Sequence, residues 1–208
     1  MSSAANLAAY TEKKQQLGAS LQNHSDIHIR LLKDTSNLFR ARKPMQGLGL
    51  DVNNFTTVIQ VDPEEGFAEV EGMTPYVDLT RECLKYGVMP TVVPQLKSIT
   101  VGGAVTGIGI ESSSFKYGLV HETLQEFDIL LADGITLTCT PENEHQRLFF
   151  GFPNSYGTLG YALKLKIKVI PVKPYVRLTH IRHRDVAAYF ADIENKCSQD
   201  IDFIDVSV

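Results

Sequence analysis

Regular alternation of apolar and polar residues predicts short strands along much of this chain. The clearest case follows Gly160, where one face of the expected strand is apolar and the other is basic: Leu163, Leu165, Ile167 and Val169 alternate with Lys164, Lys166 and Lys168. We expect the lysine face to be solvated. Further strands are expected at residues 27–32, 57–61, 67–71, 122–132, 135–139, 176–181 and 201–206. Asp133-Gly134 is the expected turn of a hairpin.

Periodic apolar residues predict helices near residues 7–17, 74–87, 143–149 and 185–197. Thr74 followed by Pro75 is typical of a helix start, because the hydroxyl can cap a backbone N–H and proline fits the first turn. Residues 1–23 are polar and alanine-rich, so we expect a short arm or a frayed helix there.

The most distinctive stretch is residues 100–118, T-V-G-G-A-V-T-G-I-G-I-E-S-S-S-F-K-Y-G. Glycines let a ligand touch the backbone, and free N–H groups in such a segment attract phosphate. A tight turn or a close helix packing would use the same glycines, so both explanations stay open. The stretch is not a dinucleotide fingerprint, because Ser112 stands where the third glycine would be, and no Gly-Lys-Ser/Thr triplet makes it a Walker A loop.

Composition narrows the class of protein. The 208 residues are 43% hydrophobic and 21% charged, as in an ordinary folded domain, and the net charge of -4 does not favour nucleic acid. We expect no transmembrane segment, because the apolar runs are too short to span a bilayer, and no secretory signal. Three scattered cysteines suit reduced thiols, so we expect a cytoplasmic protein. No histidine lies in a metal-binding pattern, so no metal site is expected.

The pattern T-V-G-G-x-x-x-G-x-G-I-E-S-S-S-x-K-Y-G resembles the flavin-binding segment of the delta-24-sterol reductase family. That family shares the fold of p-cresol methylhydroxylase (PCMH) and vanillyl-alcohol oxidase. The resemblance continues in L-A-D-G at residues 131–134 and G-T-L-G at residues 157–160, and covers residues 27–208. It implies an α+β fold in which two small subdomains hold a noncovalent FAD.

The resemblance divides the chain into three parts. Residues 1–23 are the N-terminal arm, residues 24–172 the PCMH-type FAD-binding domain, and residues 173–208 the incomplete beginning of a substrate-binding cap domain. Pro171 and Pro174 mark the second boundary.

The resemblance also implies which residues bind FAD. The main set runs along the glycine-rich stretch: Thr100, Val101, Gly102, Gly103, Ala104, Thr106, Gly107, Gly109, Ile110, Glu111, Ser112 and Ser113. Thr35, Ser36 and Asn37 stand in a second loop where many members carry glycines, and Gly157, Gly160 and Ile167 are expected near the adenine or the ring. Covalent members attach flavin through His or Cys, and His121 is the candidate here, although the sterol-reductase pattern does not require it.

Glu111 is unusual in a phosphate site, because its carboxylate would repel a phosphate. We expect it to point away from the pyrophosphate, where it would cap backbone or meet a cation such as Lys116; contact with a substrate is the alternative. No catalytic residue is assigned.

The resemblance implies an FAD-dependent oxidoreductase that reduces a carbon–carbon double bond of an apolar small molecule, with NAD(P)H as hydride donor. One alternative is an FAD-binding module or fragment without turnover. Another is a flavin-dependent transferase of the alkyl-dihydroxyacetone-phosphate synthase (alkyl-glycerone-phosphate synthase) type. A nicotinamide cofactor should bleach the flavin only in the first case.

Overall fold

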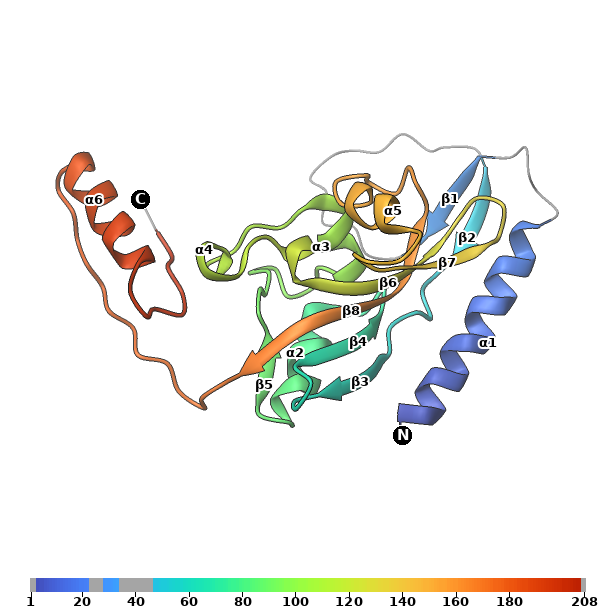
Figure 1. Ribbon diagram of the computed structural model, residues 1–208, viewed down its shortest axis with the longest axis horizontal. Helices are drawn as coiled ribbons and strands as arrows, with labels where there is room; N and C mark the ends of the chain where they lie inside the picture. The colour runs from blue at the N-terminus through green and yellow to red at the C-terminus, as the bar shows by residue number, and fades with distance from the viewer. Residues whose placement is uncertain (1–2, 23–27, 34–46, 207–208) are drawn as a thin grey trace.

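The computed structural model describes residues 3–22, 28–33 and 47–206 and shows a mixed sheet-and-helix domain with a C-terminal extension (Figure 1). The main sheet is antiparallel and has the order β3-β4-β8-β6-β7, with β5 added to β8. Its strands are β3 (Val58–Asp62), β4 (Phe67–Glu71), β5 (Val88–Pro90), β6 (Leu124–Leu130), β7 (Thr136–Cys139) and β8 (Tyr161–Pro171). A separate parallel pair joins β1 (Ile29–Leu32) to β2 (Leu48–Asp51).

Helices cover both faces of the main sheet. On one face lie α2 (Tyr76–Leu84), α3 (Val101–Gly107) and α5 (Gln146–Gly151), and their buried residues share one apolar core with β4, β6 and β8. On the other face α1 (Ser3–Leu21) forms a second core with β2, β3 and Leu163 of β8. The short α4 (Ser114–Tyr117) and the 3-10 helix η1 (Val120–Thr123) link α3 to β6. The apolar core on the face of α2, α3 and α5 holds the glycine-rich stretch against the sheet.

The N-terminal segment is a packed helix, so the helix expected near residues 7–17 is confirmed, whereas the expected arm or frayed state is wrong. Helix α1 has 19 residues, and Tyr10, Gly18 and Leu21 are buried in it. Tyr10 also packs edge-on against Phe55, with ring centroids 6.4 Å apart. The helix is therefore part of the domain that carries the sheet.

A β-bulge in β8 changes the expected alternation. The pairing with β6 shifts between Asp128 and Ile129, so Lys164 and Ala162 have partners while Leu163 between them has none. Leu163 therefore joins the core under α1, whereas Leu165 and Ile167 join the core on the opposite face. The extra residue of a bulge shifts the side chains beyond it by one position, and the sequence pattern alone did not reveal it.

The lysine face of β8 is only partly solvated, which corrects the expectation. Lys164 retains 11% of its side-chain exposure and forms ion pairs with Glu69 (3.5 Å) and Glu126 (3.2 Å). Lys166 lies over the ring of Phe67 at 3.8 Å from its centroid. Side chains of β4 and β6 thus cover Lys164 and Lys166, whereas Lys168 is exposed.

Asp128 is the buried centre of the polar contacts between α1 and the sheet. Its carboxylate accepts hydrogen bonds from the Tyr10 hydroxyl at 2.6 Å and the Thr138 hydroxyl at 2.7 Å, and it pairs with Lys14 at 3.2 Å. Burial alone would raise the pKa of Asp128, but the two hydroxyls and the charges of Lys164 and Lys14 outweigh it and hold the pKa below its ordinary value.

The lowered pKa of Asp128 predicts an acid-sensitive fold. Its contribution to stability is complete above the ordinary pKa of 3.8 and is lost as the pH falls through the lower folded-state value. Asp128→Asn should lower the free energy of unfolding by about 1–3 kcal/mol at neutral pH. Urea unfolding at several pH values checks this, and the variant should lose less stability on acidification than the wild type. Equal acid sensitivity of both proteins would contradict this role.

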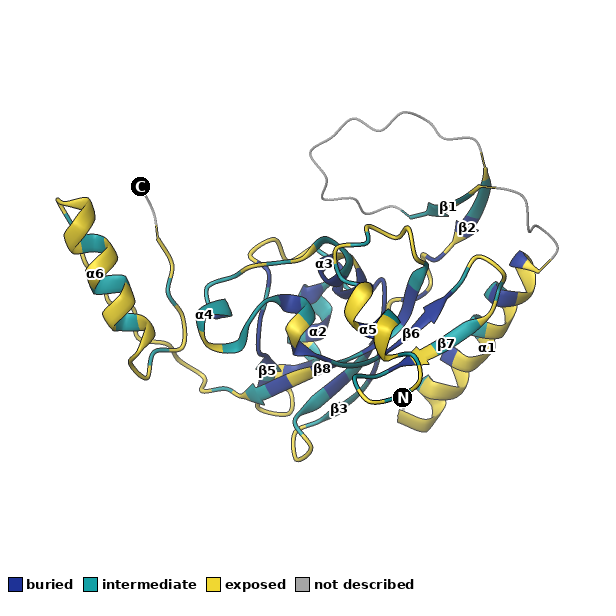
Figure 2. Ribbon diagram, turned by 45° about the horizontal axis from the view of Figure 1, so that its top comes forward, coloured by how far each residue is buried: buried dark blue, intermediate teal, exposed yellow. Residues whose placement is uncertain are grey.

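The C-terminal segment leaves the body of the domain as an extended chain that ends in α6 (Val186–Cys197) (Figure 2). The expected helix is confirmed, and the Asp185 carboxylate caps it by accepting from the N–H of Ala188. The expected strands at residues 176–181 and 201–206 are wrong, because neither segment pairs with another strand. A strand needs a partner edge, and the described part of the chain provides none there.

Candidate functional site

The glycine-rich stretch begins as helix α3. Thr100 caps it by accepting from the N–H of Gly103 at 3.2 Å. The N–H of Val101 donates to the carbonyl of Thr74, and that of Gly102 donates to the carbonyl of Gly72, both at 2.9 Å. The first N–H groups of the helix are therefore occupied by protein, so they do not form a free phosphate cradle.

Gly102 is required by close packing of three backbone segments. A Cβ on Gly102 would lie 2.8 Å from the carbonyl oxygen of Gly72, and a Cβ on Gly72 would lie 2.0 Å from that of Ala162. No side chain fits at either glycine without moving backbone. The packing explanation for the glycines thus holds at Gly102.

Gly103 and Gly107 define an open face of α3. They are four positions apart and so lie on the same side of the helix. Among the described residues outside the backbone of the helix itself, a Cβ on Gly107 would have no atom within 4 Å, and one on Gly103 would meet only the hydroxyl of Thr100, at 2.8 Å. We call this surface the open glycine face. A ligand can approach the backbone here at no cost in packing.

The loop after α3 offers free hydrogen-bond donors. In the described part of the chain, no hydrogen bond uses the backbone N–H groups of Gly109, Ile110 or Ser112. Ile108 has φ 54°, a strained conformation for a β-branched residue, and turns the chain sharply at the end of α3. The free donors therefore follow the helix and lie in the second half of the indicated stretch.

The loop before β8 meets the end of α3. The N–H of Tyr156 donates to the carbonyl of Thr106 at 3.2 Å, which places Gly157 beside the glycine-rich stretch. Asn154 and Tyr156 both have positive φ, at 62° and 51°. The hydroxyl of Ser155 is buried and has no partner among the described residues. Strained residues and an unsatisfied hydroxyl are typical of a ligand-binding loop.

Three other expected site residues are part of the packed interior, and three lie outside the described residues. Ile167 is only 1% exposed in the main core. A Cβ on Gly160 would lie 2.6 Å from the carbonyl oxygen of Leu130, so this glycine serves strand packing. Thr35, Ser36 and Asn37 lie outside the described residues. Ser113 is buried, and its hydroxyl donates to the carbonyl of Thr91.

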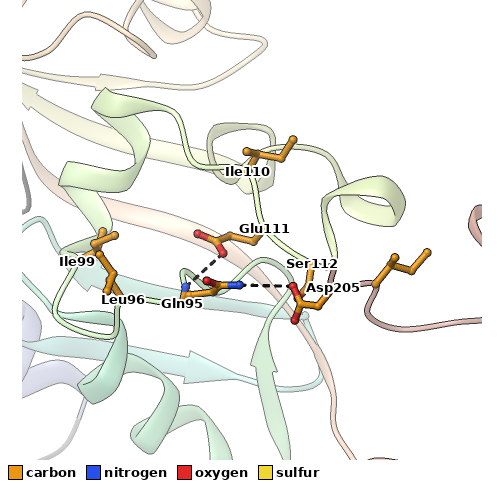
Figure 3. A pocket seen from close by; sticks show the side chains of 8 residues that line it. Gln95, Leu96, Ile99, Ile110, Glu111, Ser112 and Asp205 are labelled. Atoms are coloured by element: carbon orange, nitrogen blue, oxygen red, sulfur yellow. Dashed lines mark hydrogen bonds between the residues drawn. The ribbon is translucent and has the colours of Figure 1, made fainter. Parts of the chain in front are cut away.

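Glu111 lines a pocket of about 400 Å³ formed by three segments that are distant in sequence (Figure 3). Its Oε2 accepts from the backbone N–H of Gln95 at 3.2 Å, so the expected capping of backbone is confirmed. The expected pairing with Lys116 is wrong, because that lysine pairs with Asp200 and Asp202 of the C-terminal segment. Burial and then the nearby Asp205 raise the pKa of Glu111, against the hydrogen bond from Gln95.

Sequence reasoning missed the pocket partners of Glu111. Gln95 and Asp205 are 110 positions apart, yet the Gln95 side chain donates to the Asp205 carboxylate at 3.4 Å. Neither residue belongs to a recognisable motif, so no local signal identified them. His121 has an intermediate exposure, and its Nδ1 is buried without a partner in the described chain.

The described residues show neither a candidate metal site nor a membrane-spanning helix. Among residues 3–22, 28–33 and 47–206, no group of three or more His, Cys, Asp or Glu side chains could hold a metal ion. None of the helices in these same ranges is long and apolar enough to cross a membrane.

The fold is that of a flavin-binding domain. The FAD binding domain family matches residues 6–140, and the chain belongs to this family, whose domains are of the PCMH type. The match includes helix α1, the open glycine face and the pocket residues Gln95 and Glu111. The family binds FAD, and the open face with free N–H groups beside it fits a large anionic cofactor.

Several relatives of the chain are sterol reductases. The chain is 35% identical over 169 residues to the Delta(24)-sterol reductase of Pisum sativum, covering 73% of this chain and 30% of that protein. It is 38% identical over 125 residues to that of Homo sapiens, covering 60% and 24%. The chain thus spans less than a third of the length of these relatives.

Two more distant proteins share the fold. Cytokinin dehydrogenase 10 of Oryza sativa subsp. japonica is 27% identical over 150 residues, covering 72% of this chain and 27% of that protein. The crystal structure of 6-hydroxy-D-nicotine oxidase from Arthrobacter nicotinovorans matches with a TM-score of 0.67 at 18% identity, covering 76% of this chain and 35% of that one. The structural likeness supports the fold alone.

Proposed function

We propose that this chain binds FAD noncovalently and belongs to an oxidoreductase that reduces a carbon–carbon double bond of an apolar substrate, with NAD(P)H as hydride donor. The observation that carries the proposal is the open glycine face, which lies inside the region matched by the FAD binding domain family. The substrate class follows the Delta(24)-sterol reductases, which are relatives of this chain.

In this proposal each part of the site makes a different contact with FAD. Gly103 and Gly107 allow close approach of the cofactor to α3, and the N–H groups of Gly109, Ile110 and Ser112 meet its anionic oxygens. Gly157 approaches from the facing loop, and Thr35, Ser36 and Asn37 complete the site. FAD supplies the hydride chemistry when bound.

The domain organisation belongs to the same proposal. The two sheets, β1–β2 and the six-stranded one, are the cores of two subdomains that hold FAD between them within residues 24–172. Residues 173–208 begin a cap domain. Three free cysteines fit a reducing, cytoplasmic location.

A second candidate function is an FAD-binding module without turnover. The chain matches 24–30% of the length of the sterol reductases from Homo sapiens and Pisum sativum, so binding of FAD and turnover of a substrate need separate tests.

Anaerobic mixing of the FAD-loaded chain with NADPH separates the two functions. A reductase should lose its visible flavin absorption within the first turnovers, and a sterol with a trisubstituted side-chain double bond should then restore it. Retained flavin colour in the presence of excess NADPH would contradict the reductase and favour the module.

A further inference from the structure

The pocket at Glu111 combines apolar walls with two acidic side chains, Glu111 and Asp205. Leu96, Ile99, Ile110 and Ile204 supply its apolar walls, and its volume of about 400 Å³ lies within the usual range for small-molecule sites. The pocket contacts the glycine-rich stretch directly, because Ile110 and Glu111 belong to both. A ligand in it would therefore lie next to the proposed cofactor site (Figure 3).

One oxygen of Glu111 is available to a ligand. Oε2 is held by the backbone N–H of Gln95, while Oε1 has no hydrogen bond to any described residue. The hydrogen bond from Gln95 fixes the side chain, so the orientation of Oε1 is set before a ligand binds. A fixed acid with one free oxygen is the arrangement that proton donation requires.

The surroundings of Glu111 favour its protonated form. Burial is the largest cause of its raised pKa, and the carboxylate of Asp205 adds to it. Tyr76 of α2 is buried and stays neutral, because burial and then the charge of Glu111 raise the pKa of its hydroxyl. Lys116, the nearest cation on α4, is engaged by Asp200 and Asp202. No positive charge among these groups stabilises the Glu111 carboxylate.

The C-terminal segment completes the pocket. The N–H of Ile204 donates to the carbonyl of Ser112 at 2.9 Å, and Gln95 donates to Asp205 at 3.4 Å. These contacts bring an apolar wall and a second carboxylate to the loop that follows α3. Residues 204–205 are thus part of the site, although they lie beyond the family match that ends at residue 140.

We propose that this pocket receives the branched alkene end of an apolar substrate and that Glu111 is the catalytic acid that protonates it. The inference rests on the proposed reductase function. Saturating a carbon–carbon double bond requires one hydride and one proton. The hydride, which comes from NAD(P)H by way of the flavin, reduces one alkene carbon, and the other carbon forms its C–H bond with the proton of Glu111. The carboxylate left behind takes a proton from water, so atoms and electrons balance.

The first test needs no cofactor. Carbon-13 NMR of the side-chain carboxyls should place the pKa of Glu111 above its ordinary value of 4.5 in the wild type and closer to it in Asp205→Asn. Citronellol, an acyclic alcohol with a trisubstituted double bond, should shift the resonances of Glu111, Ile110 and Leu96. An ordinary pKa, or pocket resonances that citronellol leaves unmoved, would overturn the proposal.

The second test separates the acid from the cofactor. In Glu111→Gln that has been loaded with FAD and reduced by NADPH, reoxidation by citronellol should slow by about 100-fold or more, the usual contribution of a general acid. Glu122→Gln is the matched control, because Glu122 also accepts from a backbone N–H, that of Leu119. It should reoxidise like the wild type.

The outcomes distinguish this inference from the proposed function. Failure of FAD to bind or of NADPH to bleach it contradicts the proposed function. The NMR experiment alone then tests whether Glu111 has a raised pKa and whether the pocket binds citronellol. Bleaching by NADPH followed by equal reoxidation of the wild type and Glu111→Gln overturns only the role of Glu111. A wild type that binds citronellol but is not reoxidised by it also overturns that role.

Discussion

Replacing Gly107 by valine should abolish FAD binding while the protein remains folded. A side chain here has open space in the domain, so the substitution causes no clash within the protein. It fills the open glycine face, which the proposal assigns to the cofactor. We expect the dissociation constant for FAD to rise by at least about 100-fold, equivalent to about 2.7 kcal/mol. Fluorescence titration with FAD measures the constant, and circular dichroism checks the fold.

Gly151→Val is the matched control for this experiment. Gly151 also ends a helix, α5, and a Cβ there would likewise have no atom within 4 Å. It lies outside the open glycine face, so the control should bind FAD like the wild type. Gly103 is a less clean choice, because a Cβ there meets the capping hydroxyl of Thr100 at 2.8 Å. Wild-type affinity in Gly107→Val would contradict the location of the site.

Replacing Gly72 by alanine should destabilise the fold severely. The new methyl group would lie 2.0 Å from the carbonyl oxygen of Ala162, and backbone of β8 must move to accommodate it. The same glycine accepts the N–H of Gly102, so the start of α3 would move as well. We expect a loss of about 3 kcal/mol or more, at the upper end for overpacking.

Urea unfolding of Gly72→Ala and of Gly151→Ala measures the effect. The control has open space at Gly151 and should unfold at nearly the wild-type midpoint. Equal midpoints for Gly72→Ala and the wild type would show that the three segments do not pack as closely as described. A partly folded Gly72→Ala variant that loses FAD binding together with stability is expected, because α3 rests on this contact.

The elements with strong local signals were predictable from the sequence. The β6–β7 hairpin follows from its alternating residues, and Asp133 has the expected turn role, since it accepts from the N–H of Ile135. Helix α6 follows from Asp185 as its cap. The glycine-rich stretch pointed to the FAD binding family through its residue pattern, and the family match agrees.

Features that depend on tertiary packing were not predictable. The helix at α1 was expected, but its packing on the sheet was not, because it buries only Tyr10, Gly18 and Leu21, too few to mark an apolar stripe in the sequence. The bulge at Leu163 depends on the register with β6, which one strand does not specify.

In the candidate site, too, some features were predictable from the sequence and others were not. The open face at Gly103 and Gly107 was within the indicated stretch, because glycine marks it. The packing role of Gly102 was not visible, since its partner Gly72 is 30 positions earlier. The joining of Glu111, Gln95 and Asp205 was equally hidden, because only the folded chain brings them together.

The visible absorption spectrum of the purified chain after incubation with FAD and removal of free cofactor tests the central claim most directly. The account predicts a protein-bound flavin spectrum and complete release of the flavin into solution on denaturation, as noncovalent binding requires. A colourless protein that takes up no FAD would contradict the claim that the open glycine face of α3 is a cofactor site. Flavin that stays attached after denaturation would contradict noncovalent binding and direct attention to His121.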